Sequence, residues 1–216
     1  MEKVVIVSGG AIEDEFAREY IEKIVPDTLV AADSGLQFFF RAGITPDYVI
    51  GDFDSVDETV LQFFKKKDNI RWETLIPEKD DTDTEHAIRS CIREGAKAIT
   101  VLGATGTRLD HVFGNICLLG IGLESNVRIW IVDSKNRIRM IKDSTVIEKA
   151  EQFGNYVSVF PFLGDAQGVT ITGAKYPLER HRMKGFQSLG VSNEIVDERM
   201  TISVEQGYLV VMETRD

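Results

Sequence analysis

Apolar, β-branched runs alternate with helix-like segments through the first 133 residues of the chain. The run at 4–7 contains only Val and Ile, and similar runs lie at 28–32, 48–50, 71–76, 98–102 and 127–132. Between runs, apolar residues recur at helical spacing, as in Phe16, Tyr20 and Ile24. Strands that are apolar on both faces are typical of a parallel sheet covered by helices on both sides. The pattern therefore predicts an α/β domain.

The pattern changes near residue 133. Helical periodicity gives way to short strand-like runs, among them 156–160, 169–172 and 200–204, separated by Gly, Pro, Asn and Asp. This spacing is typical of an antiparallel sandwich or barrel. We expect an α/β domain at residues 1–133 and an all-β sandwich domain at 134–216. No Ser/Pro-rich linker separates them.

The charge balance excludes some classes of partner. The chain has 216 residues and a net charge of −10, with 25 Lys and Arg against 35 Asp and Glu. Nucleic-acid binders usually carry a basic face, so no nucleic-acid partner is expected. The first apolar run is too short for a signal peptide, and no run reaches a membrane span of about 20 residues. We expect a cytoplasmic protein without a membrane partner, and two buried thiols at Cys91 and Cys117.

Two aspartates follow the apolar run at 48–50, in the segment Gly51-Asp52-Phe53-Asp54-Ser55. On an extended backbone, residues i and i+2 point the same way, so Asp52 and Asp54 are expected to project together. Two carboxylates this close repel unless a proton or cation lies between them, and Mg²⁺ prefers such oxygen ligands. The alternative is a solvated acidic turn in which Ser55 caps the next helix.

Further acidic residues follow other predicted strands. Asp33 ends the run at 28–32, and the segment 78–85 contains Asp80, Asp81 and Asp83. Taken singly, each acid could favour a helix N-terminus, and Thr82 with Glu85 fits a capping box. Carboxyl ends of parallel strands meet at one edge, however, where ligands bind. So many carboxylates at one edge would repel one another, and a divalent cation removes that conflict.

A loop of small residues, Gly103-Ala104-Thr105-Gly106-Thr107-Arg108, follows the run at 98–102. Its N–H groups and the next helix could hold phosphate, with Arg108 as the counter-charge; the alternative is a tight turn. The loop matches neither the dinucleotide fingerprint nor the Walker motif. His111 is expected in the first turn of that helix, as a packing residue or a ligand contact. His86 and His181 have no evident partner and receive no role.

Taken in order, these segments resemble the thiamin pyrophosphokinase family. The resemblance covers nearly the whole chain and is specific because the motifs occur as an ordered set. They are Ala32-Asp33-Ser34-Gly35, Gly51-Asp52-Phe53-Asp54-Ser55, Lys79-Asp80-Asp81-Thr82-Asp83-Thr84-Glu85, the loop from Gly103 to His111, Thr172-Gly173-Ala174-Lys175-Tyr176-Pro177-Leu178 and Gly190-Val191-Ser192-Asn193.

The resemblance implies a reaction, a cofactor and an assembly. Thiamin would attack ATP through its hydroxyl and take the pyrophosphoryl group, giving thiamin diphosphate and AMP. Such a transfer mainly requires positioning and charge neutralisation, with Mg²⁺ as the implied cofactor. The family's members are homodimers with thiamin at the subunit interface, where the aspartates of one subunit face the sandwich of the other.

The resemblance also implies roles for individual residues. Asp52, Asp54 and Asp83 would organise Mg²⁺ and the triphosphate with Asp33 close by, and either Asp54 or Asp83 would take the hydroxyl proton. The nucleotide contacts would be Thr105, Gly106, Arg108, Asp110 and His111. The thiamin contacts would be Lys79 and, from the partner chain, Tyr176, Ser192 and Asn193.

Two of these positions depart from the family pattern. Some members have Gln in place of Lys79 and Trp in place of Tyr176. Tyr176 can still stack on an aromatic ring, whereas an ammonium beside the cationic thiazolium has no evident purpose. The residues also fit a related transferase that acts on another alcohol, and a non-catalytic module that binds thiamin or a nucleotide.

Overall fold

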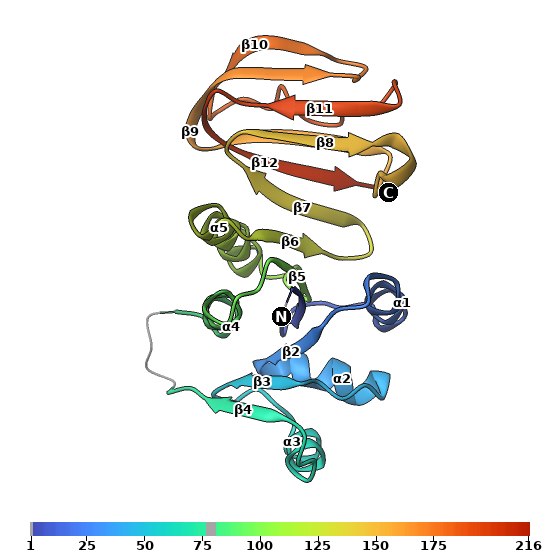
Figure 1. Cartoon of the computed structure of the whole chain (residues 1–216), viewed down its shortest axis with the longest axis vertical. Helices are drawn as coiled ribbons and strands as arrows, with labels where there is room; N and C mark the ends of the chain where they lie inside the picture. Colours follow the sequence, from blue (N-terminus) through green and yellow to red (C-terminus); the bar gives the residue numbers. More distant parts are fainter. Residues whose placement is uncertain (1, 77–80) are drawn as a thin grey trace. The chain divides into compact units, whose positions relative to one another are not determined.

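The computed structural model describes residues 2–76 and 81–216. The chain forms two compact units, Met1–Ser134 and Lys135–Asp216 (Figure 1). Among the described helices, none combines the length and the apolar character that crossing a bilayer requires.

A parallel sheet forms the centre of the first unit. Its strand order is β4-β3-β2-β1-β5-β6, and every neighbouring pair in this order is parallel. Val5, Ile6 and Val7 in the middle of the sheet are completely buried, which explains the uninterrupted apolar run in the sequence. The strands are β1 (Lys3–Val7), β2 (Thr28–Ala32), β3 (Tyr48–Gly51), β4 (Arg71–Thr74), β5 (Ala98–Leu102) and β6 (Arg128–Val132).

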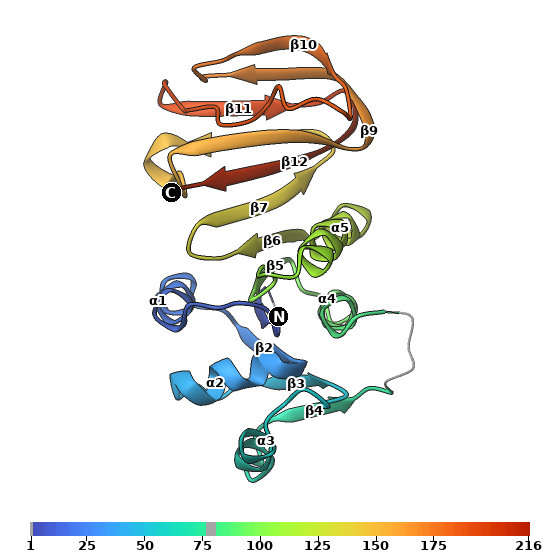
Figure 2. The same ribbon diagram turned by 180° about the vertical axis from the view of Figure 1, so that it is seen from behind.

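Helices cover both faces of this sheet. Helices α1, α2 and α3 lie on one face and α4 and α5 on the other, as Figures 1 and 2 show. The predicted α/β arrangement is therefore confirmed in this unit. The helices are α1 (Asp14–Ile24), the short 3-10 turn η1 (Asp33–Gly35), α2 (Leu36–Ala42), α3 (Glu58–Lys65), α4 (Asp83–Arg93) and α5 (Leu109–Ser125).

The strand order reverses beside β1. The chain first adds β2, β3 and β4 on one side of β1 and then returns to place β5 on the other side. In open α/β sheets, ligands bind at such a reversal, outside the carboxyl ends of the strands. Here the two loops lie in contact: Gly10 N–H donates to Gly103 O at 2.8 Å. The segments after β1, β2, β3 and β5 therefore share one edge of the sheet.

Antiparallel strands make up the second unit: β7 (Asn136–Ile141), β8 (Ser144–Glu148), β9 (Tyr156–Thr172), β10 (Leu178–Met183), β11 (Arg199–Ser203) and β12 (Gln206–Thr214), with a 3-10 turn η2 (Lys149–Glu151). Strand β9 belongs to two groups of strands. Its first half pairs with β12 and its second half with β10 and β11. Between the halves, Leu163 and Gly164 have positive φ angles of 60° and 137°.

One hydrophobic core joins the two strand groups of this unit. It includes Val157 and Val159 from the first half of β9, Ile171 from the second half, and Met200 and Ile202 from β11. The antiparallel prediction is confirmed, with two differences. The runs at 156–160 and 169–172 are parts of one long strand, and β10 was not predicted because only its two end residues are apolar.

The prediction of two buried thiols is right for Cys91 and wrong for Cys117, which is exposed. Burial raises the pKa of the Cys91 thiol to about 12. Cys117 lies on α5, whose apolar residues face more than one direction. Phe113, one turn earlier, is 62% exposed. The apolar residues near Cys117 in the sequence therefore do not imply that its side chain is buried.

Gly103 offers a test of the close approach between the loops after β1 and β5. It has φ 65°, and a Cβ there would lie 2.4 Å from Ser8 O. Gly43 has a similar φ of 69° with nothing near its Cβ position. We expect Gly43→Ala to lower the free energy of unfolding by about 1–2 kcal/mol, from backbone strain alone. Gly103→Ala should lower it by roughly a further 1–3 kcal/mol through overpacking. Urea unfolding of both variants checks this, and equal losses would contradict it.

Candidate functional site

Three carboxylates meet at the ends of β2 and β3. Asp33 directly follows β2, and Asp52 and Asp54 follow β3. One oxygen from each carboxylate lies within 4.8 Å of one oxygen from each of the other two. Asp33 and Asp52 are half-buried, whereas Asp54 is exposed. We refer to these three residues as the acidic cluster.

A tight turn brings the acidic cluster together, in place of the expected extended strand. Strand β3 ends at Gly51, and Phe53 has a left-handed φ of 66°. Within the turn, Asp54 N–H donates to Asp52 Oδ1 at 3.2 Å. The ring of Phe53 packs edge-on against Trp72 of β4, with centroids 5.5 Å apart. The prediction that Asp52 and Asp54 project together from an extended strand is therefore wrong, because the turn at Phe53 brings them together.

Asp33 has one satisfied and one unsatisfied carboxylate oxygen. Its Oδ2 accepts a hydrogen bond from Ser55 Oγ, but its Oδ1 is buried with no hydrogen-bond partner among the described residues. A buried charged oxygen without a partner is unfavourable by several kcal/mol, as an order of magnitude. A bound cation would satisfy it. Ser55 does not cap α3 as the alternative reading had it, because the cap is Asp57, which accepts from Thr59 N–H at 2.8 Å.

The charges of the acidic cluster act on one another. The negative charge of Asp52 raises the pKa of Asp54, and desolvation and the charge of Asp33 add to the effect. Asp83 acts in the same direction and is therefore within electrostatic reach. An all-oxygen, strongly negative set of donors fits a hard divalent cation. The structure thus places four predicted residues, Asp33, Asp52, Asp54 and Asp83, in one electrostatic neighbourhood.

Asp83 opens α4, whose first turn is anchored at both sides. Thr82 caps the helix by accepting from Glu85 N–H at 3.2 Å, as the capping alternative had it, whereas the Glu85 side chain pairs with Arg89. Thr84 Oγ1 lies 2.9 Å from Ser8 Oγ, at the end of β1. These contacts fix the helix start relative to the sheet edge. The predicted residues Lys79 and Asp80 lie outside the described part of the chain.

The loop after β5 is held by its backbone. Thr105 O accepts from Ala11 N–H at 2.8 Å, and Ala104 O accepts from the Asn115 side chain at 2.8 Å. Gly106 has φ 156°, and a Cβ there would lie 3.2 Å from Ala11 N. The loop therefore lies directly against the segment after β1, at the strand reversal.

Arg108 and Asp110 pair with each other at the start of α5. Arg108 Nη2 lies 2.6 Å from Asp110 Oδ2, and both side chains are exposed. The hydrogen bond from Arg108 lowers the pKa of Asp110 and raises the pKa of Arg108, so both remain charged at neutral pH. His111 is exposed in the first turn of α5, where it was predicted. The pair presents one cation and one anion to solvent.

In the second unit, Asn193 holds the backbone of Tyr176. Its Oδ1 accepts from Tyr176 N–H at 3.0 Å, and its Nδ2 donates to Tyr176 O at 2.8 Å. Asn193 is buried, whereas Tyr176 is 61% exposed. Ser192, with φ 56°, donates its N–H to Ser158 Oγ at 3.0 Å. The structure therefore brings these three predicted residues together, with the tyrosine ring presented to solvent.

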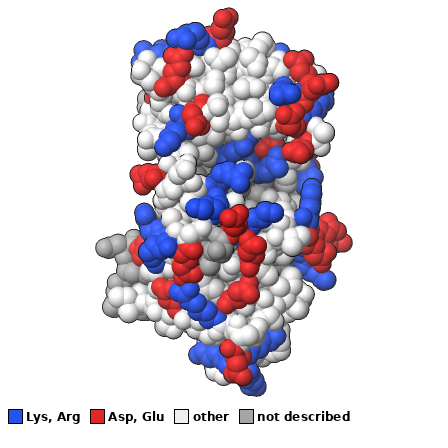
Figure 3. All heavy atoms as spheres, in the orientation of Figure 1, with Lys and Arg blue, Asp and Glu red and all other residues white. Residues whose placement is uncertain are grey.

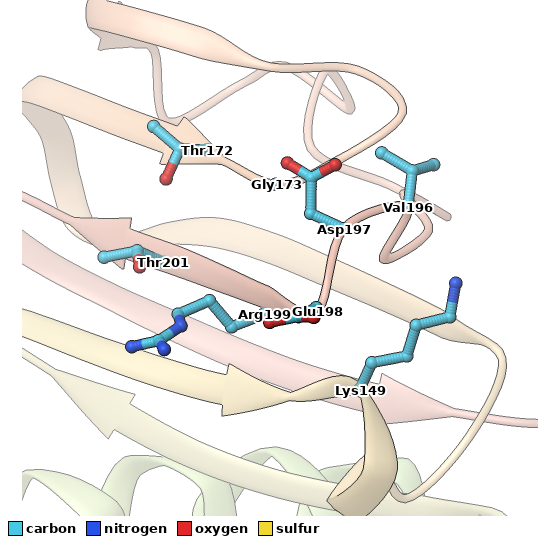
Figure 4. A pocket seen from close by; sticks show the side chains of 8 residues that line it. All are labelled: Lys149, Thr172, Gly173, Val196, Asp197, Glu198, Arg199 and Thr201. Carbon is cyan, nitrogen blue, oxygen red and sulfur yellow. The ribbon is translucent and has the colours of Figure 1, made fainter.

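The second unit also contains an open pocket of about 740 Å³ (Figure 4). None of the sequence-predicted site residues lines it. Lysine and arginine side chains mix there with two acidic ones, so its charge does not favour one class of ligand. The lining residues are Lys149, Thr172, Gly173, Val196, Asp197, Glu198, Arg199 and Thr201.

The face of the molecule in Figure 3 carries charged side chains of both signs. On the face in Figure 3, acidic and basic side chains are interspersed over both units. Among the described residues, the acidic cluster gathers three carboxylates with oxygens within 4.8 Å of one another. Anions such as phosphate would need a cation to approach it.

Sequence reasoning missed several residues that shape this site. Phe53 and Trp72 set the turn between the two aspartates, Ser55 binds Asp33, and the Ser8–Thr84 contact anchors α4. Ser55 stands next to the acids and could have been found by its hydroxyl. The others depend on contacts between segments far apart in the sequence, for which a single sequence carries no signal.

Comparisons with known proteins cover nearly the whole chain. Residues 22–131 match the model of the thiamin pyrophosphokinase catalytic domain, and residues 144–209 match that of its vitamin B1 binding domain. Thiamine pyrophosphokinase of Bacillus subtilis is 32% identical over 187 residues, covering 87% of each chain.

Solved structures agree with these matches. The crystal structure of the Bacillus subtilis enzyme superposes with a TM-score of 0.88 at 31% identity, covering 100% of both chains. That of thiamin pyrophosphokinase from Geobacillus thermodenitrificans gives 0.82 at 29% identity, covering 99% of this chain and 98% of the other. The yeast enzyme, at 16% identity, shares the fold with a TM-score of 0.79 over 99% of this chain and 86% of the other.

The raised pKa of Asp54 predicts a pH-dependent stability effect. Above the ordinary value of 3.8, the folded chain keeps a proton that the unfolded chain has lost, so the free energy of unfolding falls as pH rises through this window. Asp54→Asn removes the effect. In chelator-treated buffer, we expect this variant to be more stable than the parent protein at pH 7 and equally stable below pH 3.8. Urea unfolding across this range measures it.

Asp68→Asn is the control for that experiment, because Asp68 is an exposed carboxylate outside the acidic cluster. Its stability should follow that of the parent protein at every pH. A variant Asp54→Asn that is no more stable than the parent at pH 7 would show that the acidic cluster carries no net repulsion.

Proposed function

The chain belongs to the thiamin pyrophosphokinase family, and we propose that its acidic cluster binds the metal ion of the family's reaction. The resemblance seen in the sequence is thus confirmed. The chain is a transferase that uses ATP and thiamin, moves the pyrophosphoryl group to the thiamin hydroxyl, and makes thiamin diphosphate and AMP. Enzymes of this kind generally require a divalent metal ion.

Mg²⁺ is the ion that we propose for the acidic cluster. Asp33, Asp52 and Asp54 supply only oxygen donors, which suits a hard ion, and the partnerless Asp33 Oδ1 carries the proposal most directly. Asp83 is the fourth proposed member. When bound, such an ion neutralises phosphate charge and orients the triphosphate. The cluster's own part is to hold a fixed, preorganised set of charges at the sheet edge.

The thiamin hydroxyl must lose its proton during the transfer, and we propose Asp54 or Asp83 as the acceptor. Asp54 is the exposed member of the acidic cluster and so the most accessible to a substrate hydroxyl. Asp52 raises its pKa, which increases its basicity. Asp83 lies at the start of α4, where contacts of its neighbours Thr82 and Thr84 anchor the first turn.

The nucleotide is proposed to bind along the loop after β5 and the start of α5. The loop lies at the strand reversal, and a 17-residue helix directs its N-terminus towards that edge. Arg108 is the proposed counter-charge for phosphate. To bind phosphate, its guanidinium would have to break its ion pair with Asp110 or contact both groups at once. The proposed contacts are Thr105, Gly106, Arg108, Asp110 and His111.

Thiamin is proposed to bind the second unit. We propose that residues 134–216 form a β-sandwich domain and that residues 1–133 form the catalytic domain. The match of residues 144–209 to a vitamin B1 binding domain supports this. Tyr176 would stack on thiamin, with Ser192 and Asn193 fixing its place. A homodimer with thiamin at the subunit interface, a role for Lys79 and a cytoplasmic location stay predictions.

Substitution of Asp54 tests the catalytic part of this proposal. We expect Asp54→Asn to reduce kcat for AMP release by at least about 10²-fold, because it removes a charge of the acidic cluster and one proposed base. The assay measures AMP formed from ATP, with and without thiamin and Mg²⁺. Circular dichroism should show an unchanged fold. Asp68→Asn is again the control, and near-normal turnover by Asp54→Asn would remove the metal-site proposal.

Substitution of Tyr176 tests the thiamin part. Loss of ring stacking in Tyr176→Ala should raise KM for thiamin roughly tenfold, which corresponds to about 1.4 kcal/mol. Tyr176→Trp keeps an aromatic face and should retain the parent KM within about threefold. KM for ATP should not change in either variant. An unchanged thiamin KM in Tyr176→Ala would place the ring outside the site.

A further inference from the structure

His86 lies between two carboxylates on different segments. It belongs to the first turns of α4, and its Nε2 lies 2.9 Å from Glu73 Oε1 of β4. On its other side, Nδ1 lies 3.2 Å from Asp81 Oδ2, just before the helix. The side chain of His86 is only 24% exposed. The ring therefore connects the edge strand of the sheet with the segment that leads into α4.

Glu73 is a fixed acceptor for this histidine. Tyr48 of β3 donates its hydroxyl to Glu73 Oε2, and the Arg71 guanidinium lies 4.3 Å from the centroid of the Tyr48 ring. Burial acts to raise the pKa of Glu73, but the hydrogen bonds from Tyr48 and His86 outweigh it and lower that pKa. Burial and Glu73 raise the pKa of Tyr48 to about 12, so its hydroxyl stays a donor.

The two contacts of His86 are made with different parts of the chain, Asp81 just before α4 and Glu73 of β4. An ionised carboxylate only accepts hydrogen bonds, and an imidazole donates from one nitrogen when neutral and from both when protonated. The Glu73 contact ends on a side chain that other residues already fix. Asp81 is bound on the far side of the ring and stands two residues before Asp83. The helix start is therefore restrained by both contacts together, since Asp81 reaches β4 through the ring.

Asp83 lies between two such restraints. Thr84 ties the first turn to β1 through Ser8, and His86 ties the preceding residue Asp81 to β4. His86 and Asp83 are also three residues apart on one helix, so they lie on neighbouring positions of the same face. A change at His86 would therefore act on the helix start that carries Asp83.

We propose that His86 is a positioning residue for the pyrophosphoryl transfer: by contacting Glu73 and Asp81 together, it fixes the start of α4 and the direction of the Asp83 carboxylate. The inference rests on the proposed role of Asp83 in the acidic site. No role followed for His86 from the sequence, because its partners lie 13 and 5 residues away in segments whose packing the sequence does not show. A misplacement of about 1 Å at a reacting centre can reduce the rate by 10²-fold.

Two conservative variants separate the contacts of the ring. The amide nitrogen of Asn can take the place of Nδ1, and that of Gln the place of Nε2. His86→Asn therefore keeps the Asp81 contact, and His86→Gln keeps the Glu73 contact. We expect His86→Gln to lower kcat by about tenfold and to raise the half-saturating Mg²⁺ concentration, with KM for thiamin unchanged. His86→Asn should lower kcat by a similar factor, because loss of the Glu73 contact also frees Asp81 from β4.

Asp81→Ala breaks the same contact from its other end. It should lower kcat by about as much as His86→Gln does. The double variant His86→Gln/Asp81→Ala should lower kcat no further than either single variant, because both substitutions remove the same contact. His181→Gln is the matched control, since His181 is exposed on β10 and should leave kcat unchanged. Steady-state kinetics of the full chain, with thermal melting to establish folding, supply these numbers.

Three results would overturn the role of His86. They are an unchanged kcat and Mg²⁺ dependence in both His86→Gln and Asp81→Ala, an unchanged kcat and Mg²⁺ dependence in His86→Asn, or fully additive losses in the double variant. Failure of the proposed function can be told apart from failure of the His86 role, because it would be seen in the parent protein itself. AMP release by the parent protein would then require neither thiamin nor Mg²⁺.

Discussion

Electrostatic repulsion among carboxylates at one edge of a parallel sheet is the constraint on which this site depends. Asp33, Asp52 and Asp54 place oxygens within 4.8 Å of one another, and the pKa of Asp54 rises in response to Asp52. A flexible chain would relax by moving these groups apart. Here the strands that carry them end in buried residues, Ala31 and Ala32 in β2 and Val49 and Ile50 in β3, so the repulsion is retained and the site suits a cation.

The fold opposes this repulsion with close backbone packing. A Cβ on Gly51 would lie 3.0 Å from Asp33 Cα, so a glycine at this position favours the close approach of the ends of β2 and β3. Phe53, held edge-on against Trp72, takes the left-handed conformation that turns Asp54 back towards Asp52. The acidic site is thus a product of the sheet, one glycine and one aromatic contact, and its rigidity suits a reaction that depends on positioning.

The sequence predicted those parts of the fold and the site that depend on neighbouring residues, and missed those that depend on contacts between separate segments. The apolar run of β1 and the acids after β2 and β3 are local patterns, and they predicted the α/β unit and its acidic edge. The Phe53–Trp72 contact, the Ser55–Asp33 bond and the His86–Glu73 contact join separate segments, so no local pattern contains them. Strand β10 escaped prediction for another reason: it is a charged, exposed strand whose sequence has no strand-like alternation.

The central claim is that Asp33, Asp52 and Asp54 together hold one divalent cation. Anomalous diffraction from crystals soaked in Mn²⁺, which accepts the same oxygen ligands as Mg²⁺, tests it directly. We expect one peak at coordination distance from an oxygen of each of the three carboxylates, including the buried Asp33 Oδ1. No peak at saturating Mn²⁺, or a peak bound by other residues, would contradict the account.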